Sequence, residues 1–149
     1  MARGSRRAPL SPLHSALHLL HRAGQRADGL FARHMGESSL TARQFAILQA
    51  VTEADGLSQT AIMAATGIDR SSTAELVRRL VSAGWLKRRR TRRDARLYAV
   101  RITARGRRVL TAGARAARAA DEALFSAAPA NLRASFVKTL ALLAGVPAS

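Results

Sequence analysis

The sequence contains no cysteine among its 149 residues. A structural disulfide is therefore excluded, and so is peroxide sensing through a reactive thiol. Acidic residues are scarce, since nine Asp and Glu stand against 25 Lys and Arg, which gives a formal net charge of +16. Long apolar runs are absent as well, because no stretch approaches the roughly 20 residues that a membrane-spanning helix needs. The length fits one domain with a substantial core.

Signals for secretion and for enzymes are also missing. Residues 1–7 are basic and lead into an amphipathic segment, so no signal peptide is expected and the protein is predicted to be cytoplasmic. The chain has no P-loop and no Gly-x-Ser-x-Gly motif. The adjacent Asp121 and Glu122 are explained as surface charge on a helix. We therefore expect that the protein is not an enzyme.

The positive charge is concentrated in one segment. Residues 70–108 contain 14 basic side chains and only two acidic ones, Glu75 and Asp94. A concentrated basic field predicts a polyanionic partner, which is DNA, RNA or an anionic membrane surface. A membrane peptide would pair its charge with an apolar helical face. Here the charge falls on a predicted hairpin and on the polar side of capped helices, which favours nucleic acid.

The segment that precedes the basic run predicts two short helices joined by a tight turn. Ser58 is a suitable N-cap for a helix over 59–65, and Gly67 supplies the turn. Asp69 caps a second helix, which extends to about Ala83 and places its apolar residues at helical spacing. Two helices in this arrangement are typical of a helix-turn-helix, although two core helices with solvated outer faces would give a similar pattern.

In a helix-turn-helix the start of the second helix meets the base edges of the major groove. Small hydroxyl residues there allow close approach and can bond to phosphates or bases. The candidate DNA contacts in the two helices are Ser58, Gln59, Arg70, Ser71, Ser72, Thr73 and Arg78.

A β-hairpin is predicted after the second helix. Residues 85–90 and 95–102 are rich in β-branched, aromatic and alternating residues, and 91–94 lie between them. Such a wing would enter a minor groove, where its arginines are attracted by the negative channel. Trp85 is expected to anchor the base of the hairpin to the second helix. The candidate DNA contacts of the wing are Arg92, Arg93, Asp94 and Arg96, with Asp94 as an orienting partner for the arginines.

The chain resembles the MarR family of bacterial transcriptional regulators over residues 57–106. The similarity lies in the order Ser71-Ser72-Thr73, Leu76-Val77-x-Arg79-Leu80, Gly84-Trp85-Leu86, Asp94-x-Arg96 and Ile102-Thr103, with Gly106 following. The resemblance implies a mainly α fold with a small β-hairpin wing, a winged helix-turn-helix. It also implies a dimer whose second motif helix reads the major groove and whose Arg96 enters the minor groove.

The sequence departs from that family at Glu75. Many relatives carry a basic residue there. A carboxylate cannot contact phosphate, so Glu75 is expected to accept a hydrogen bond from cytosine or to pair with a neighbouring arginine.

Amphipathic helices flank the predicted DNA-binding lobe at 37–103. The first starts near Ser11 with Pro12 at its first position, and after the wing Thr103 caps a helix through about Ser126. Pro129 opens a final helix. Segments 10–36 and 104–145 are therefore predicted to form a dimerisation platform, and residues 1–9 a loose basic tail. The candidate interface residues are Leu13, Leu17, Leu20, Leu132, Phe136 and Leu140.

Three histidines, His14, His18 and His21, lie on one flank of the first predicted helix. Histidines at i and i+4 can share a metal, but the nearby arginines would repel a cation, so no metal site and no cofactor are predicted. Simple packing at an interface explains this cluster. Together with Arg22, it is alternatively a candidate site for a small anionic or aromatic effector.

The sequence thus predicts a ligand-responsive repressor that binds palindromic double-stranded DNA as a homodimer, associated with the nucleoid when bound. The alternative is a packaging or RNA-binding protein that uses the same charge without sequence choice. The membrane is not an expected partner.

Overall fold

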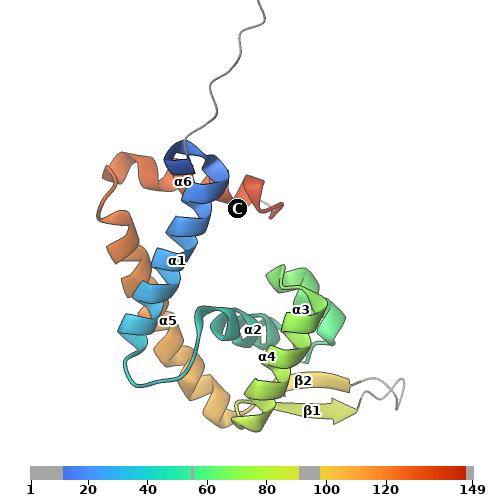
Figure 1. Ribbon diagram of the computed structural model, residues 1–149. Helices are drawn as coiled ribbons and strands as arrows, with labels where there is room; N and C mark the ends of the chain where they lie inside the picture. The colour runs from blue at the N-terminus through green and yellow to red at the C-terminus, as the bar shows by residue number, and fades with distance from the viewer. Residues whose placement is uncertain (1–11, 55, 91–97, 147–149) are drawn as a thin grey trace, which may run out of the picture.

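The computed structural model describes residues 12–54, 56–90 and 98–146. These residues form two lobes, a helical platform and a smaller lobe that carries a hairpin (Figure 1). The described elements are, in chain order, the 3-10 turn η1 (Pro12–His14), α1 (Ala16–Met35), α2 (Ala42–Glu53), α3 (Gln59–Thr66), α4 (Arg70–Ser82), β1 (Leu86–Arg90), β2 (Tyr98–Ile102), α5 (Ala104–Phe125), the 3-10 turn η2 (Ala130–Leu132) and α6 (Arg133–Leu143). The predicted fold class, mainly α with a β-hairpin, is confirmed. No described helix is both long and apolar enough to cross a membrane.

Local capping explains where the helices of the smaller lobe begin. The Thr41 hydroxyl accepts from the Gln44 backbone N–H, and the Gln44 side chain accepts from the Thr41 N–H, which forms a capping box. Ser58 and Asp69 accept from backbone N–H groups at the starts of α3 and α4. Gly67 ends α3 in the left-handed conformation, with φ 69°. The predicted caps and the predicted turn are confirmed.

The two proline-led helices begin later than predicted. The first segment starts with η1, and α1 follows only after Ser15, so Leu13 lies on a separate turn. At the other end, Pro129 precedes η2, and Leu132 lies on that turn rather than on α6. Proline fixes φ and lacks an N–H, which suits a first turn but does not decide whether that turn is 3-10 or α.

One hydrophobic core joins the two lobes. Ile47 and Leu48 of α2, Ile62 of α3 and Leu80 of α4 are fully buried, and Phe31 of α1 packs against the same cluster. The burial of each such side chain contributes about 1.5–3 kcal/mol to stability.

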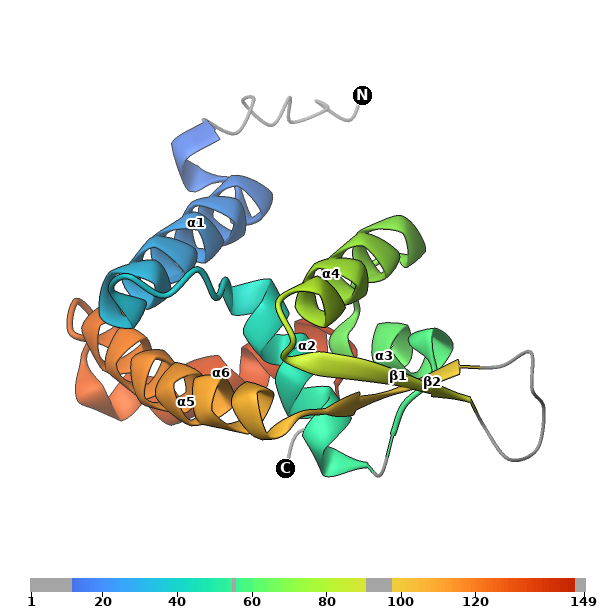
Figure 2. The ribbon, with the colours of Figure 1, turned by 90° about the horizontal axis from the view of Figure 1, so that it is seen from below.

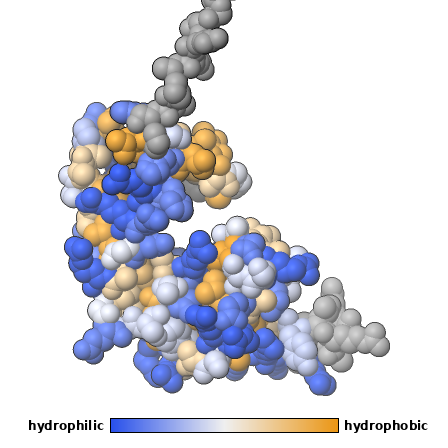
Figure 3. Space-filling model, viewed as in Figure 1, coloured by the Kyte–Doolittle hydropathy of each residue, from blue (hydrophilic) through white to orange (hydrophobic). Residues whose placement is uncertain are grey.

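In the platform, α1 runs alongside α5 (Figures 1 and 2), and α6 follows the end of α5 and lies behind α5 in the view of Figure 2. The α5 stripe uses small residues at its contacts, since Gly113, Ala116 and Ala120 are buried. A Cβ added to Gly113 would lie 2.5 Å from Cδ2 of Phe45, so glycine permits the close approach of α5 to α2. No residue of α6 is buried. Figure 3 shows a hydrophobic surface over the α6 end of the platform.

The hairpin is antiparallel, with Leu86 paired with Ile102 and Arg90 with Tyr98. A bridge between Leu57 and Val100 adds the segment before α3 to the outer side of β2. Trp85 is buried at the base of the hairpin, and its backbone N–H donates to the Leu80 carbonyl of α4. The predicted role of Trp85 as an anchor between the hairpin and α4 is confirmed.

Candidate nucleic-acid interface

The start of α4 presents a polar surface. Arg70 and Ser71 are exposed, and Ser72 is half-buried. The Asp69 carboxylate closes the helix end, because its Oδ1 accepts from the Ser72 backbone N–H at 2.9 Å and from the Ser71 hydroxyl at 2.8 Å. Hydrogen bonds from the Ser72 side chain, from its backbone N–H and from Ser71 hold the pKa of Asp69 well below its usual value. The carboxylate therefore stays charged and fixes the position of this helix end.

One predicted contact, Thr73, is wrong. Its side chain is fully buried, and its hydroxyl donates to the Ile68 carbonyl at 3.2 Å. A threonine can turn inward when a carbonyl of the preceding turn accepts its proton, and Ile68 supplies that carbonyl. The side chain of Thr73 is thus part of the core. On α3, Ser58 and Gln59 are exposed, as the predicted contact requires, although the Ser58 hydroxyl is engaged as the helix cap.

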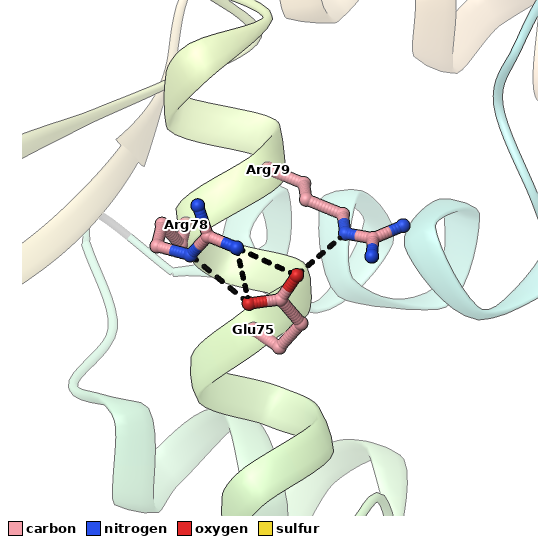
Figure 4. A network of polar contacts seen from close by, with 3 residues as sticks. All are labelled: Glu75, Arg78 and Arg79. Atoms are coloured by element: carbon pink, nitrogen blue, oxygen red, sulfur yellow. Dashed lines mark hydrogen bonds and ion pairs between the residues drawn. The ribbon is translucent and has the colours of Figure 1, made fainter.

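The exposed face of α4 carries a carboxylate between two arginines (Figure 4). Oε1 of Glu75 accepts from Nη2 of Arg78 and from Nε of Arg79, each at 2.7 Å. Oε2 accepts from Nη2 of Arg78 at 2.6 Å and from its Nε at 3.0 Å. These hydrogen bonds, those from Arg78 first, lower the pKa of Glu75. Of the two roles expected for Glu75, pairing with a neighbouring arginine is the one present in the free chain.

The hairpin adds a continuous basic edge. All four residues from Lys87 to Arg90 are exposed. Lys87 also lines a cleft of about 450 Å³ with Arg101, Arg107 and one acidic residue, Glu53, a grouping that the sequence pattern did not single out. The remaining predicted wing contacts, Arg92, Arg93, Asp94 and Arg96, lie outside the described residues.

The structure does not gather the three histidines around a cavity. His14 and His21 are exposed, His18 is half-buried, and Arg22 is exposed. His21 contacts Gln25, with their Nε2 atoms 3.2 Å apart. None of these side chains lines any of the cavities described below.

Two cavities have the size of small-molecule sites. One, of about 550 Å³, lies between the lobes and is lined by the end of α1, the connector 38–41, the first turn of α2 and Leu76 of α4. The other, of about 500 Å³, is almost entirely apolar and is lined by α1, the end of α5, and α6. Sequence patterns did not reveal the cavity between the lobes, because its walls come from segments far apart along the chain.

Comparisons with known proteins agree with this geometry. Residues 38–97, which contain α2, α3, α4 and β1, match the sequence model of the MarR family. The chain is 26% identical over 125 residues to the transcriptional regulator HosA of Escherichia coli O157:H7, an alignment that covers 80% of this chain and 93% of HosA.

Two solved structures share the whole architecture. BpsR of Bordetella bronchiseptica, whose DNA binding is regulated by 6-hydroxynicotinic acid, aligns with a TM-score of 0.84 at 25% identity, over 93% of this chain and 100% of that chain. The PcaV transcriptional regulator of Streptomyces coelicolor, in complex with its natural ligand, aligns with a TM-score of 0.83 at 27% identity, over 93% and 98%. In its fold, in the segment 38–97 and in its matching relatives, the chain is similar to the MarR family of transcriptional regulators.

Proposed function

We propose that this protein is a sequence-specific DNA-binding repressor that acts as a homodimer on palindromic operators. The observation that carries the proposal is the exposed polar start of α4, set beside a hairpin with four consecutive exposed basic residues, 87–90. Arg70 offers a cation to phosphate beside the start of α4, and the exposed side chains of this first turn lie where base edges can approach them. Ser71, Ser72 and Arg78 are the proposed groove contacts, and Arg70 is a proposed phosphate contact.

The platform supports dimerisation. Leu17 is 81% exposed, and Leu142 and Leu143 are each 70% exposed. Apolar side chains also line the cavity between α1, α5 and α6. Monomeric proteins rarely leave contiguous apolar surfaces of this kind in water. We infer that a second copy covers this face, with Leu13, Leu17, Leu20, Leu132, Phe136 and Leu140 among the contacts.

A two-fold dimer presents two copies of α4. They suit half-sites about one turn, roughly 10 base pairs, apart. If the dimer neutralises about 6–10 phosphates, its affinity falls by about 10³–10⁵ between 50 and 200 mM salt. Bare charge therefore supplies affinity at low salt, and sequence choice is best measured near physiological salt.

The proposed function includes a small anionic aromatic effector. The DNA binding of BpsR is regulated by a ligand of this class, 6-hydroxynicotinic acid. The cavity between the lobes is the proposed site here, in place of the histidine flank, because residues of both α1 and α4 line it; its charged lining side chains are Arg43, which would attract the acid, and Asp28. A ligand that binds one separation of the lobes better than another would shift the population toward that state.

The experiment is selection from a random duplex pool at about 150 mM salt, where unspecific attraction is screened. We expect a palindromic motif with half-sites one turn apart. If no motif is recovered and binding collapses as salt rises, the protein packages nucleic acid without sequence choice and the proposal is wrong.

Effector response is tested on the preformed complex. Fluorescence anisotropy with 6-hydroxynicotinic acid, and then with other aromatic acids, is expected to show release of DNA, and R43Q is expected to respond more weakly. If no acid releases the DNA at millimolar concentration, or if R43Q responds like the parent protein, the cavity between the lobes is not the effector site.

A further inference from the structure

We propose that Glu75 is a positioning residue that fixes the guanidinium of Arg78 to read a guanine in each half-site. This inference rests on the proposed function and adds to it the base that α4 recognises. It is carried by the contacts among Glu75, Arg78 and Arg79 on the exposed face of α4 (Figure 4).

The carboxylate lies at the centre of the exposed face. Thr73, Val77 and Leu80 define the buried side of α4. At 100° per residue, Glu75 lies almost opposite their mean direction, with Ser71 and Arg78 to one side of it and Ser72 and Arg79 to the other. Any duplex that docks on this face therefore meets Glu75 and its two arginines together.

Both oxygens of the carboxylate are engaged by the two arginines. Three nitrogens, Nε and Nη2 of Arg78 and Nε of Arg79, make four contacts with the two carboxylate oxygens, at 2.6–3.0 Å, because Nη2 lies within reach of both oxygens. An ionised carboxylate offers about four lone-pair sites. Both oxygens of Glu75 are therefore engaged while the two arginines are bound, and the exposed donors on this face belong to the arginines, so base recognition falls to them.

Arg78 is held along one edge and free along another. Its Nε and Nη2 both donate to Glu75, which fixes the plane of the guanidinium. The end edge, formed by Nη1 and the second N–H of Nη2, points away from the carboxylate, and 66% of the side chain is exposed. Arginine binds O6 and N7 of guanine through two such parallel donors.

Arg79 is held differently. Only its Nε donates to Glu75, so the guanidinium is free to turn about its own axis. A guanidinium held by one hydrogen bond is mobile, and this mobility suits binding to phosphate better than binding to a defined base. The two arginines thus take different roles although they are neighbours with similar exposure.

The test compares five proteins in the same duplex selection and in anisotropy titrations at fixed salt: the parent, E75Q, R78K, R79K and E122Q. Lysine keeps the charge of arginine but lacks its planar fork. E122Q is the control, because it removes one negative charge as E75Q does, but at an exposed position on α5 outside the proposed recognition helix. Thermal unfolding confirms that every variant is folded.

The parent is expected to select an invariant G·C pair in each half-site. R78K is expected to lose this preference, by a factor in the range of roughly 5–150 that a bidentate contact provides. E75Q should weaken the preference at the same base pair and at no other, while R79K and E122Q should keep it and change only the affinity for all sequences.

The proposal is overturned if E75Q keeps the parent preference within twofold, or if R79K rather than R78K loses it. Failure of the proposed function gives a different result, because then the parent protein itself selects no motif. A parent motif that survives E75Q unchanged refutes the role of Glu75 alone.

Discussion

The junction between α5 and the hairpin allows a quantitative prediction for Gly106→Ala. A Cβ at this position would lie 2.1 Å from the Trp85 carbonyl oxygen and 2.8 Å from Cγ1 of Ile102. The carbonyl cannot move aside easily, because it already accepts from the Thr103 N–H at 3.0 Å. The start of α5 must therefore shift away from the hairpin. Overpacking of this kind costs about 1–3 kcal/mol, and the better helix propensity of alanine offsets about 1 kcal/mol at most.

Gly29→Ala is the matched control. Gly29 is an exposed glycine within α1, and an added Cβ there meets nothing within 4 Å. This variant should gain about 0.4–1 kcal/mol, because alanine restricts the unfolded chain. For a chain of this size, about 1 kcal/mol shifts Tm by about 2–4 °C. Thermal unfolding at one fixed protein concentration should place Gly106→Ala several degrees below Gly29→Ala. A Gly106→Ala variant that melts at or above the parent protein would refute the argument.

The remaining predictions concern α5, the dimer, the wing and acidity. Thr103→Ala should lose about 0.5–2 kcal/mol of unfolding free energy in denaturant titrations, because the hydroxyl accepts from the Gly106 N–H at 3.0 Å and donates to the Gly84 carbonyl at 2.7 Å. Thr103→Ser should retain most of the stability. Equal loss in both variants would contradict the role of the hydroxyl as a helix cap. Leu17→Asp should dissociate the dimer in sedimentation at low micromolar concentration, whereas an intact dimer would remove α1 from the interface. Arg96→Ala should weaken operator binding by about 1–3 kcal/mol in anisotropy titrations at fixed salt. Unchanged binding would show that Arg96 does not contact the operator. The pKa of Asp69 is lowered in the folded chain, so the stabilising effect of its carboxylate is present above the usual carboxyl pKa and is lost as pH falls. The Tm advantage of the parent protein over Asp69→Asn should therefore shrink from pH 7 to pH 3. A constant difference in Tm would count against a charged cap at Asp69.

Local chemistry made much of this fold predictable. Ser58, Asp69 and Thr103 are N-caps whose side chains bond to backbone groups three residues away, so sequence spacing alone indicates the helix starts. The MarR resemblance likewise rests on a contiguous segment.

Features that depend on distant segments were not predictable in this way. Thr73 looked like an outward polar residue, and only its contact with the Ile68 carbonyl turns it inward. The requirement for glycine at 113 comes from Phe45, which lies far away in sequence. The cavity between the lobes combines α1, the connector and α4. The assignment of different roles to Arg78 and Arg79 needed the geometry of their donors, which spacing does not give.

The hairpin has a consequence for self-association. Leu57 pairs along the outer side of β2, whereas in the described part of the chain no segment pairs along the outer side of β1. An open strand edge offers unpaired backbone groups to another chain, and such edges promote aggregation unless charge blocks them. Four of the five residues of β1, from Lys87 to Arg90, are basic and exposed. Two hairpins that approached edge to edge would repel each other, so this charge protects the free protein from aggregation.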